Sequence, residues 1–396
     1  MQCFVGTCRR SVPLCIGQCM KHQPGLNTLC VHAAHAPEPS TGALAEPICL
    51  STTFERNADG EYPRGYRYSR EGTPNRTALE SCMAALEGGI GAVAFASGLA
   101  ANMAVLELLE SGERLVAPRE GYYGTLKQFH DYSRNRGIRL EVADLCDPAA
   151  LESATAGSAR LVWLETPTNP LLNLIDLKRA VTRGHQAGAL VVCDNTFATP
   201  VCQRPFDFGV DLVIHSATKY LGGHSDVLGG MVVVRDDAAV LERLQAWQRS
   251  AGSPLAPFDC WLLRRSIATL TLRVRAQCRG ALEVAQFLDA HPAVERVFYP
   301  GLASHPGHVL AATQMRGGFG AMLSVCIAGG GEAALRAAGR TRLFTRATSL
   351  GGVESLIEHR ASIEGPGTRA PQNLLRLSVG IEEPADLIGD LEQALG

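Results

Sequence analysis

The sequence has no excess of charge of either sign, no paired-cysteine motif and few aromatic residues. Lys and Arg number 37 against 39 Asp and Glu, a formal net charge of −2. Nucleic acids and anionic membranes select basic surfaces, so this balance speaks against either as a partner. The 13 cysteines are scattered with no C-x-x-C pair. This pattern is typical of buried thiols in a reducing compartment, so we expect a cytoplasmic protein without a metal site.

Long hydrophobic runs are also missing. The longest uncharged stretch, 88–106, contains Ser97, Gly98 and Asn102 and is followed by charge at Glu107. It therefore predicts a buried strand leading into a helix, not a membrane span. Residues 1–19 carry cysteines and arginines without an apolar core and cleavage site, so a secretory signal is not indicated. We expect this segment to be disordered or absent from the mature protein.

The 396 residues, 46% of them hydrophobic, suffice for two domains. Short apolar runs alternate with helical patterns, which predicts an α/β domain with a mostly parallel sheet buried on both faces. The expected strands of this sheet are 92–96, 114–117, 161–165, 190–193, 212–215 and 231–234. A second, smaller sheet is expected to contain 320–327 and 374–379. The predicted organisation is an extended N-terminal arm over 1–60, a large domain over 61–250 and a small C-terminal α/β domain over 251–396.

Ligands of open parallel sheets bind at the carboxyl ends of the strands. One expected strand enters a helix through Ser97-Gly98, where free amides and the helix dipole favour an anion, although a simple helix cap has the same appearance. Another strand runs into Asp194. A buried aspartate needs a cation or several donors, and the alternative is an Asp that caps the next turn.

A third strand exit carries Ser216, Thr218 and Lys219. A lysine in a partly desolvated crevice has a lowered pKa and can attack a carbonyl group. An anion site, a buried carboxylate and such a lysine are together what pyridoxal phosphate requires. The combination predicts this cofactor more specifically than any one of the three features.

Seven motifs in a fixed order strengthen this interpretation. They are YRYSR at 66–70, FASG at 95–98, ETPTNP at 165–170, DNT at 194–196, HSATKYL at 215–221, SLGGVES at 349–355 and LRLS at 375–378. With them, the chain from about residue 25 to its end resembles the trans-sulfuration enzymes. That family comprises cystathionine γ-synthase, cystathionine γ- and β-lyases, methionine γ-lyase and homoserine sulfhydrylases. The resemblance implies fold-type I, with a large domain built on a mostly parallel, seven-stranded type of sheet.

The resemblance assigns catalytic roles to Lys219, Asp194 and Tyr122. Lys219 would hold the cofactor covalently and then move protons at Cα and Cβ of the substrate. Asp194 would keep the pyridine nitrogen protonated, and Tyr122 would stack on the ring and suit protonation of the leaving group. The ring hydroxyl would contact Asn169, and Thr196 would belong to the same cofactor site.

The phosphate of the cofactor would be held by the amides of Gly98 and Leu99 and by the hydroxyls of Ser216 and Thr218. In the family, the residues that match Tyr68 and Arg70 reach the phosphate of a neighbouring subunit. The resemblance therefore implies a homotetramer, a dimer of dimers with shared active sites.

The substrate side keeps the family's arginine but departs from its pattern elsewhere. Arg376 would clamp the substrate α-carboxylate, with Ser349 and Thr348 nearby. Thr348 stands where cystathionine synthases and γ-lyases usually have glutamate. Glu71 replaces a second arginine while Arg67 replaces an acid, and Lys127 replaces an arginine. We expect a rearranged distal pocket in which Glu71 favours a cation or amine, unless Glu71 is merely a solvated helix-start carboxylate.

These features imply an enzyme of cysteine and methionine metabolism acting on a small amino-acid substrate. The expected reaction is γ-replacement or γ-elimination on a homoserine ester or a cystathionine-like amino acid. Alternatives are β-elimination of the cystathionine β-lyase type, O-acyl-homoserine sulfhydrylase activity, and a catalytically silent, cofactor-binding paralogue. A dedicated methionine γ-lyase is disfavoured because Gly124 stands where such enzymes carry cysteine.

Overall fold

The computed structural model describes residues 24–365 and 368–396, so the expectation for residues 1–19 lies outside the described part. Its strands form two sheets, one seven-stranded and one five-stranded. The strands of the larger sheet are β1 Gly91–Phe95, β2 Arg114–Pro118, β3 Arg139–Ala143, β4 Leu161–Glu165, β5 Leu190–Asp194, β6 Leu212–Ser216 and β7 Gly230–Val234. Those of the smaller sheet are β8 Val294–Phe298, β9 Met322–Ile327, β10 Thr345–Arg346, β11 Leu356–His359 and β12 Leu374–Ser378.

The larger sheet has the order β1-β7-β6-β5-β4-β2-β3, and only β7 runs antiparallel to its neighbours. Strands β4, β5 and β6 are parallel neighbours in this order, so their carboxyl ends lie side by side. This is the edge of an α/β sheet at which ligands bind. The smaller sheet, ordered β10-β11-β12-β9-β8, is mostly antiparallel.

Alternate residues of the large-sheet strands enter two separate hydrophobic cores. In β1, Val93 and Phe95 belong to one core, whereas Ala92 and Ala94 belong to the other. Helices therefore cover both faces, and an apolar run without polar alternation is the expected sequence of such a strand. All six strands predicted for this sheet are confirmed within one or two residues. The prediction missed β3, an edge strand whose residues are only partly buried and whose sequence is correspondingly polar.

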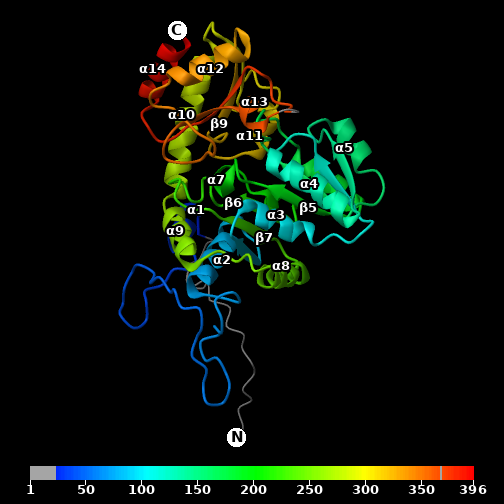
Figure 1. Cartoon of the computed structure of the whole chain (residues 1–396), viewed down its shortest axis with the longest axis vertical. Helices are drawn as coiled ribbons and strands as arrows, with labels where there is room; N and C mark the ends of the chain where they lie inside the picture. Colours follow the sequence, from blue (N-terminus) through cyan, green and yellow to red (C-terminus); the bar gives the residue numbers. More distant parts are fainter. Residues whose placement is uncertain (1–23, 366–367) are drawn as a thin grey trace.

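Fourteen α-helices are formed by the described residues, and Figure 1 shows them around and between the sheets. They are α1 Leu26–His32, α2 Pro74–Glu87, α3 Gly98–Leu106, α4 Tyr123–Arg136, α5 Pro148–Ala154, α6 Leu177–Gln186, α7 Thr199–Cys202, α8 Ala238–Ala251, α9 Pro257–Ile267, α10 Leu270–Asp289, α11 His308–Gln314, α12 Gly330–Arg340, α13 Arg360–Glu364 and α14 Pro384–Leu395. A 3₁₀ helix, η1, covers Pro205–Phe208. The long helix α10 connects the region of the large sheet with the small one (Figure 1). In the sequence, all strands of the large sheet precede residue 250 and all strands of the small sheet follow it. The domain limits themselves remain a proposal.

The N-terminal arm is partly helical, which differs from the expectation of a purely extended segment. Helix α1 packs against α2 and α10, and its Cys30 is fully buried. Arg264 of α9 donates to the carbonyl oxygens of Cys30, Val31 and Ala33 at 3.1, 3.2 and 2.8 Å. These bonds satisfy the carbonyls at the end of a helix too short to be stable alone, so tertiary packing decides its existence.

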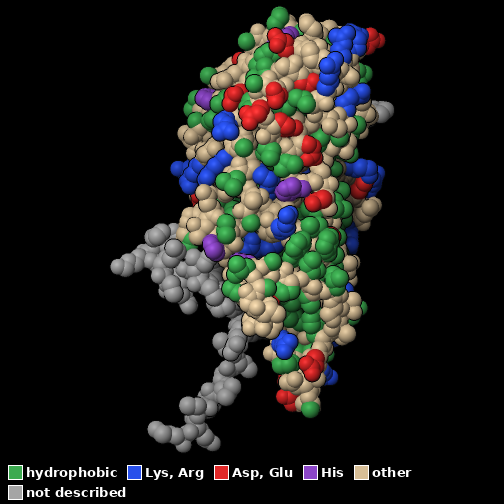
Figure 2. Space-filling view, turned by 90° about the vertical axis from the view of Figure 1, so that its left-hand side faces the viewer, with side chains coloured by type: hydrophobic (Ala, Val, Ile, Leu, Met, Phe, Trp, Pro, Cys, Tyr) green, Lys and Arg blue, Asp and Glu red, His purple; other side chains and the backbone are tan. Residues whose placement is uncertain are grey.

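Between α1 and α2 the chain has no regular element and projects away from the body (Figure 1). Figure 2 shows hydrophobic side chains gathered on the lower part of the face above this projection. Large hydrophobic residues exposed on the arm and on α9 and α10 include Leu44, Leu50, Phe258 and Leu272. In the described part of the chain, no helix is both long and apolar enough to cross a bilayer.

Candidate active site

A cavity of about 340 Å³ lies at the carboxyl ends of the large-sheet strands and is closed on its other side by the small sheet. Strand ends and helix starts supply one wall, and the segments around β11 and β12 supply the other. The predicted site residues that line it are Gly98, Leu99, Tyr122, Asn169, Asp194, Thr196, Ser216, Thr218, Lys219, Thr348, Ser349 and Arg376. These residues are far apart in the sequence, and the fold brings them into one cavity.

One end of the cavity is suited to an anion. Ser97 caps α3 by accepting from the amide of Ala100 at 3.1 Å, which leaves the first amides of α3 directed toward the cavity. A Cβ at Gly98 would lie 3.2 Å from the Cβ of Ser216, so glycine allows β6 to approach the helix start closely. Across this gap, Thr218 exchanges hydrogen bonds with the backbone of Gly229. The amides, hydroxyls and helix dipole together form an anion site.

Asp194 ends β5 beside the ends of β4 and β6. Its Oδ1 accepts from the amide of Thr196 at 3.0 Å, and the hydroxyl of Thr196 accepts from the amide of Ser216 at 2.8 Å. Burial raises the pKa of Asp194, and the donors of Thr196 oppose that rise. Thr196 thus links the carboxylate to the anion end. No lysine or arginine among the described residues forms an ion pair with Asp194.

Glu165 is a second buried carboxyl group that the sequence interpretation did not assign to the site. It lies directly opposite Asp194 in the register of β4 and β5. Burial, and then the neighbouring Asp194, raise the pKa of Glu165 well above its usual value. Its Oε2 accepts from the amide of Tyr122 at 2.9 Å. Glu165 therefore fixes the backbone where Tyr122 enters the cavity.

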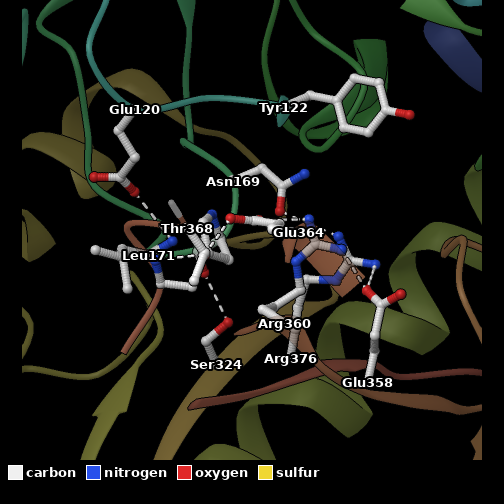
Figure 3. A network of polar contacts seen from close by, with 12 residues as sticks. Glu120, Tyr122, Asn169, Leu171, Ser324, Glu358, Arg360, Glu364, Thr368 and Arg376 are labelled. Carbon is white, nitrogen blue, oxygen red and sulfur yellow. Dashed lines mark hydrogen bonds and ion pairs between the residues drawn. The ribbon is translucent and has the colours of Figure 1, made fainter. Parts of the chain in front are cut away.

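Tyr122, drawn in Figure 3, lines the cavity and is 37% exposed. Its ring contacts that of Tyr123 edge to face, with centroids 5.0 Å apart. Burial raises the pKa of the Tyr122 phenol. A Cβ at Gly124 would lie 2.7 Å from the Tyr122 ring, so any larger residue there must move the ring. Glycine at position 124 is thus a steric requirement of this tyrosine conformation.

Lys219 follows β6 and extends across the cavity toward the small sheet. Its Nζ donates to the hydroxyl of Ser349 at 2.7 Å. Burial, and then the positive charge of Arg376, lower the pKa of Lys219 to about 8. At pH 7 about a tenth of the amine is then neutral, far more than for an ordinary lysine, which favours its action as a nucleophile or base. Ser349 has φ +81°, a conformation that only glycine adopts without strain.

Arg376 on β12 is almost completely buried. Its Nη1 donates to Asn169 Oδ1 at 3.1 Å, and its Nη2 donates to the carbonyl of Ser349 at 3.0 Å. The same Nη2 lies 2.7 Å from Glu358 Oε2. Figure 3 shows Arg376 with Asn169 and Glu358, together with Arg360, whose guanidinium lies beside that of Arg376. Burial lowers the pKa of Arg376 to about 10, and the charge of Arg360 adds to this effect.

Four predicted site residues lie outside the cavity of their own chain. Arg70 is exposed, donates to the carbonyl of Arg249 at 3.3 Å and lies 5.5 Å from the Tyr68 ring. Glu71 pairs with Arg67 at 3.6 Å on the surface. Lys127 pairs with Asp131 of its own helix at 2.5 Å.

Besides Glu165, sequence reasoning missed Glu358 and Arg360, which also line the cavity. Glu358 follows the apolar pair Leu356-Ile357, so a carboxylate after a buried run was a usable signal, as it was for Asp194. Arg360 gave no such signal, because an arginine in a polar segment is usually solvated.

The donor set fits pyridoxal phosphate. The anion end matches a phosphate, the buried carboxylate without a cation matches a protonated ring nitrogen, and the lowered pKa of Lys219 suits an amine that attacks an aldehyde. Tyr122 supplies an aromatic face between these groups.

Comparisons with known proteins agree with the geometry. A family model described as "Cys/Met metabolism PLP-dependent enzyme" matches residues 27–396. A cystathionine γ-synthase of Mycobacterium tuberculosis is 45% identical over 94% of this chain and 97% of its own. A cystathionine β-lyase of Coxiella burnetii is 42% identical over 93% of this chain and 97% of its own.

Among solved structures, the cystathionine γ-synthase of Xanthomonas oryzae in complex with cystathionine has a TM-score of 0.91 and 42% identity. The match covers 94% of this chain and 98% of that one. The expectations of fold, cofactor and trans-sulfuration type are confirmed by these findings. This chain therefore belongs to the family of pyridoxal-phosphate-dependent enzymes of cysteine and methionine metabolism.

Proposed function

We propose that this enzyme catalyses γ-replacement or γ-elimination on a homoserine ester or a cystathionine-like amino acid. The observation that carries the proposal is the position of Lys219. Its side chain lines the same cavity as Asp194 and Arg376, its amine donates to Ser349 at 2.7 Å, and the charge of Arg376 acts on it. An amino acid held by its carboxylate at Arg376 would present its Cα and Cβ hydrogens to this amine.

Bound pyridoxal phosphate supplies an electron sink that weakens the bonds at the substrate Cα and makes its Cβ hydrogens acidic. The amides of α3, Ser216 and Thr218 would hold the phosphate, and the carboxylate of Asp194 would stabilise a protonated ring nitrogen. Lys219 holds the cofactor between turnovers and takes and returns protons at Cα and Cβ. The phenol of Tyr122, whose pKa is raised by burial, remains protonated and can donate to a leaving group.

Arg376 orients the substrate carboxylate through its planar guanidinium, which Asn169 and the Ser349 carbonyl already fix. Thr348 lines the cavity next to Ser349 and offers a neutral hydroxyl to the distal part of the substrate. The side chain at this position therefore does not repel an anionic leaving group.

A second candidate is β-elimination. A relative named cystathionine β-lyase is 42% identical, close to the 45% of the relatives named cystathionine γ-synthase. The same lysine serves both reactions, so identity of this order does not separate them. O-acyl-homoserine sulfhydrylase activity and a silent cofactor-binding paralogue remain the further alternatives to be tested.

We also propose a cytoplasmic homotetramer, a dimer of dimers in which Tyr68 and Arg70 reach the phosphate site of a neighbouring subunit. The position of both residues outside their own cavity supports this, as do the exposed hydrophobic residues of the arm. Balanced charge supports the proposed absence of nucleic acid and membrane partners. Light scattering of the purified holoenzyme measures the subunit number, and a monomer would contradict the shared site.

The decisive experiment is incubation of the cofactor-loaded protein with L-cystathionine and identification of the keto acid by mass spectrometry. Release of 2-oxobutanoate is expected and would establish γ-elimination. Release of pyruvate would establish β-elimination. If no keto acid forms, O-acetyl- and O-succinyl-homoserine with L-cysteine or sulfide are the next substrates, and inactivity with all of them would support the silent paralogue.

A further inference from the structure

Glu358 is shared by two arginines at the substrate end of the cavity. Its Oε2 lies 2.7 Å from Arg376 Nη2 and 2.5 Å from Arg360 Nη1. All three side chains are at least nine-tenths buried. Glu358 Oε1 has no hydrogen-bond partner among the described residues. The negative charge of Glu358 is therefore balanced through one oxygen by two cations.

The backbone fixes this arrangement. Glu358 and Arg376 lie directly opposite each other in the antiparallel register of β11 and β12. Arg360 begins α13 immediately after β11 and is held from its other edge by Glu364 Oε1 at 2.7 Å. Its guanidinium also lies 5.7 Å from the centre of the Tyr123 ring. Figure 3 shows the two guanidinium groups side by side with Glu358 bridging them.

A carboxylate bonded to Arg376 competes with the carboxylate of a substrate for the same cation. Two facing carboxylates repel each other, and in a buried site this repulsion is weakly screened. A second cation on the same oxygen draws the charge of Glu358 away from Arg376 and restores a positive potential at the clamp. Arg360 is the cation in that place.

We propose that Arg360 is a positioning residue for substrate binding, which holds Glu358 so that Arg376 remains available to the substrate α-carboxylate. This inference rests on the proposed role of Arg376 as the carboxylate clamp. It extends that role by naming the residue that sets the affinity of the clamp. Arg360 contacts neither Lys219 nor Asp194 in the structure and acts through Glu358 and Arg376.

The variant Arg360→Met keeps the volume and removes the charge. Glu358 then has Arg376 as its only cation, so KM for the amino-acid substrate should rise about tenfold while kcat changes less than about threefold. The double variant Glu358→Gln with Arg360→Met removes the carboxylate that caused the loss. We expect its KM to return to within about threefold of the parent value. Arg360→Lys keeps the charge but lacks the two-pronged guanidinium, so its KM should lie between those of the parent and of Arg360→Met.

A merely structural role of Arg360 would lower kcat and raise KM together, and Glu358→Gln would not repair the loss. That result overturns the proposal. Inhibition constants give an independent measure. In Arg360→Met the inhibition constant of butanoate, a carboxylate without an amine, should rise in parallel with KM, whereas that of propylamine should not. Equal weakening of both inhibitors also contradicts the proposal. Arg336→Met, which removes an exposed ion pair with Glu332 on α12, is the surface control.

Arg376→Met distinguishes the proposed role of Arg376 as the clamp from the proposed role of Arg360. If it leaves KM and butanoate inhibition unchanged, the proposed clamp is wrong. If it abolishes butanoate inhibition but Arg360→Met has no effect, the clamp stands and the role of Arg360 fails. Thermal melting and cofactor absorbance of each variant establish that the proteins compared are folded and loaded.

Discussion

The cavity wall built by the seven-stranded sheet presents polar groups without ionic partners, whereas the wall built by the five-stranded sheet is already filled with ion pairs. On the first wall Asp194 has only hydrogen-bond donors and Lys219 has only a hydroxyl. On the second wall Arg376, Glu358 and Arg360 share one network. Unpaired buried charge is costly, so the first wall is arranged to receive a charged cofactor. On the second wall two arginines, Arg376 and Arg360, already face two carboxylates, Glu358 and Glu364.

Lys219→Ala, on the wall built by the seven-stranded sheet, should cause the largest loss of activity. It removes both the covalent anchor and the base, so keto acid formation should fall by at least about a thousandfold. The measurement is turnover of the substrate identified in the cystathionine experiment. Unchanged melting temperature would show that the loss is chemical. Residual activity within tenfold of the parent would contradict the assignment.

Asp194→Ala removes the carboxylate that is proposed to face the ring nitrogen of the cofactor. We expect cofactor to remain bound, because the phosphate site is intact, while turnover falls by about a hundredfold or more. Cofactor content is measured by absorbance after gel filtration, and turnover by keto acid release. Thr196→Val is the matched control that keeps the carboxylate and its backbone amide donor and removes only the hydroxyl of Thr196. Full activity of Asp194→Ala would refute its role.

The pH dependence of cofactor capture by the cofactor-free enzyme tests the state of Lys219. Burial and Arg376 lower its pKa to about 8 from 10.5. The neutral amine is the nucleophile, so the rate at which the cofactor-free enzyme captures pyridoxal phosphate should rise about tenfold per pH unit on the acid side and level off above about pH 8. In Arg376→Met the midpoint should move to higher pH because one cation has been removed. A profile still rising steeply at pH 9.5 would contradict the lowered pKa.

Ser349 joins the two walls through its bond to Lys219, and its backbone is strained. Ser349→Gly relieves the positive φ and should increase the free energy of unfolding by about 1 kcal/mol, whereas Ser349→Ala should not. Both variants lose the hydroxyl and should lower kcat by about the same few-fold factor. Denaturant unfolding and kinetics measure the two effects. Equal stability of the two variants would show that the strain is compensated elsewhere.

Glu71 tests whether the cavity is completed by another subunit, and the expected effect is the smallest. It lies on the surface in a pair with Arg67, outside its own cavity. If a neighbouring cavity receives it, Glu71→Gln should raise KM for the true substrate about threefold. Glu61→Gln, another exposed carboxylate of the segment between α1 and α2, serves as control. An unchanged KM would identify Glu71 as a solvated carboxylate.

Three of the predicted residues that line the cavity share one property: they end or follow buried apolar runs. Asp194, Ser216 and Lys219 each come after a strand that the hydrophobic pattern predicts, and parallel strand ends meet at one edge. The same reasoning did not find β3 or α1. Strand β3 is a half-polar edge strand, and α1 is stabilised by α2, α10 and Arg264, all distant in sequence.

The role of the second wall was decided by tertiary contacts. Arg360 and Glu358 are close in sequence, but their significance depends on the β11–β12 register that places Glu358 opposite Arg376. No local pattern reports which strand pairs with which. The burial of Arg360 likewise depends on Tyr123 and Glu364 closing over it.

By itself the sequence determined the α/β fold, the cofactor and the family, because buried strands and the motifs at their ends are local patterns. Tertiary structure alone decided which of the charged residues meet in the cavity. It placed Glu165 beside Asp194, Glu358 between two arginines, and Glu71 and Lys127 outside. The physical reason is that charge interactions depend on distance in space and on burial, and both are set by the packing of segments remote in the chain.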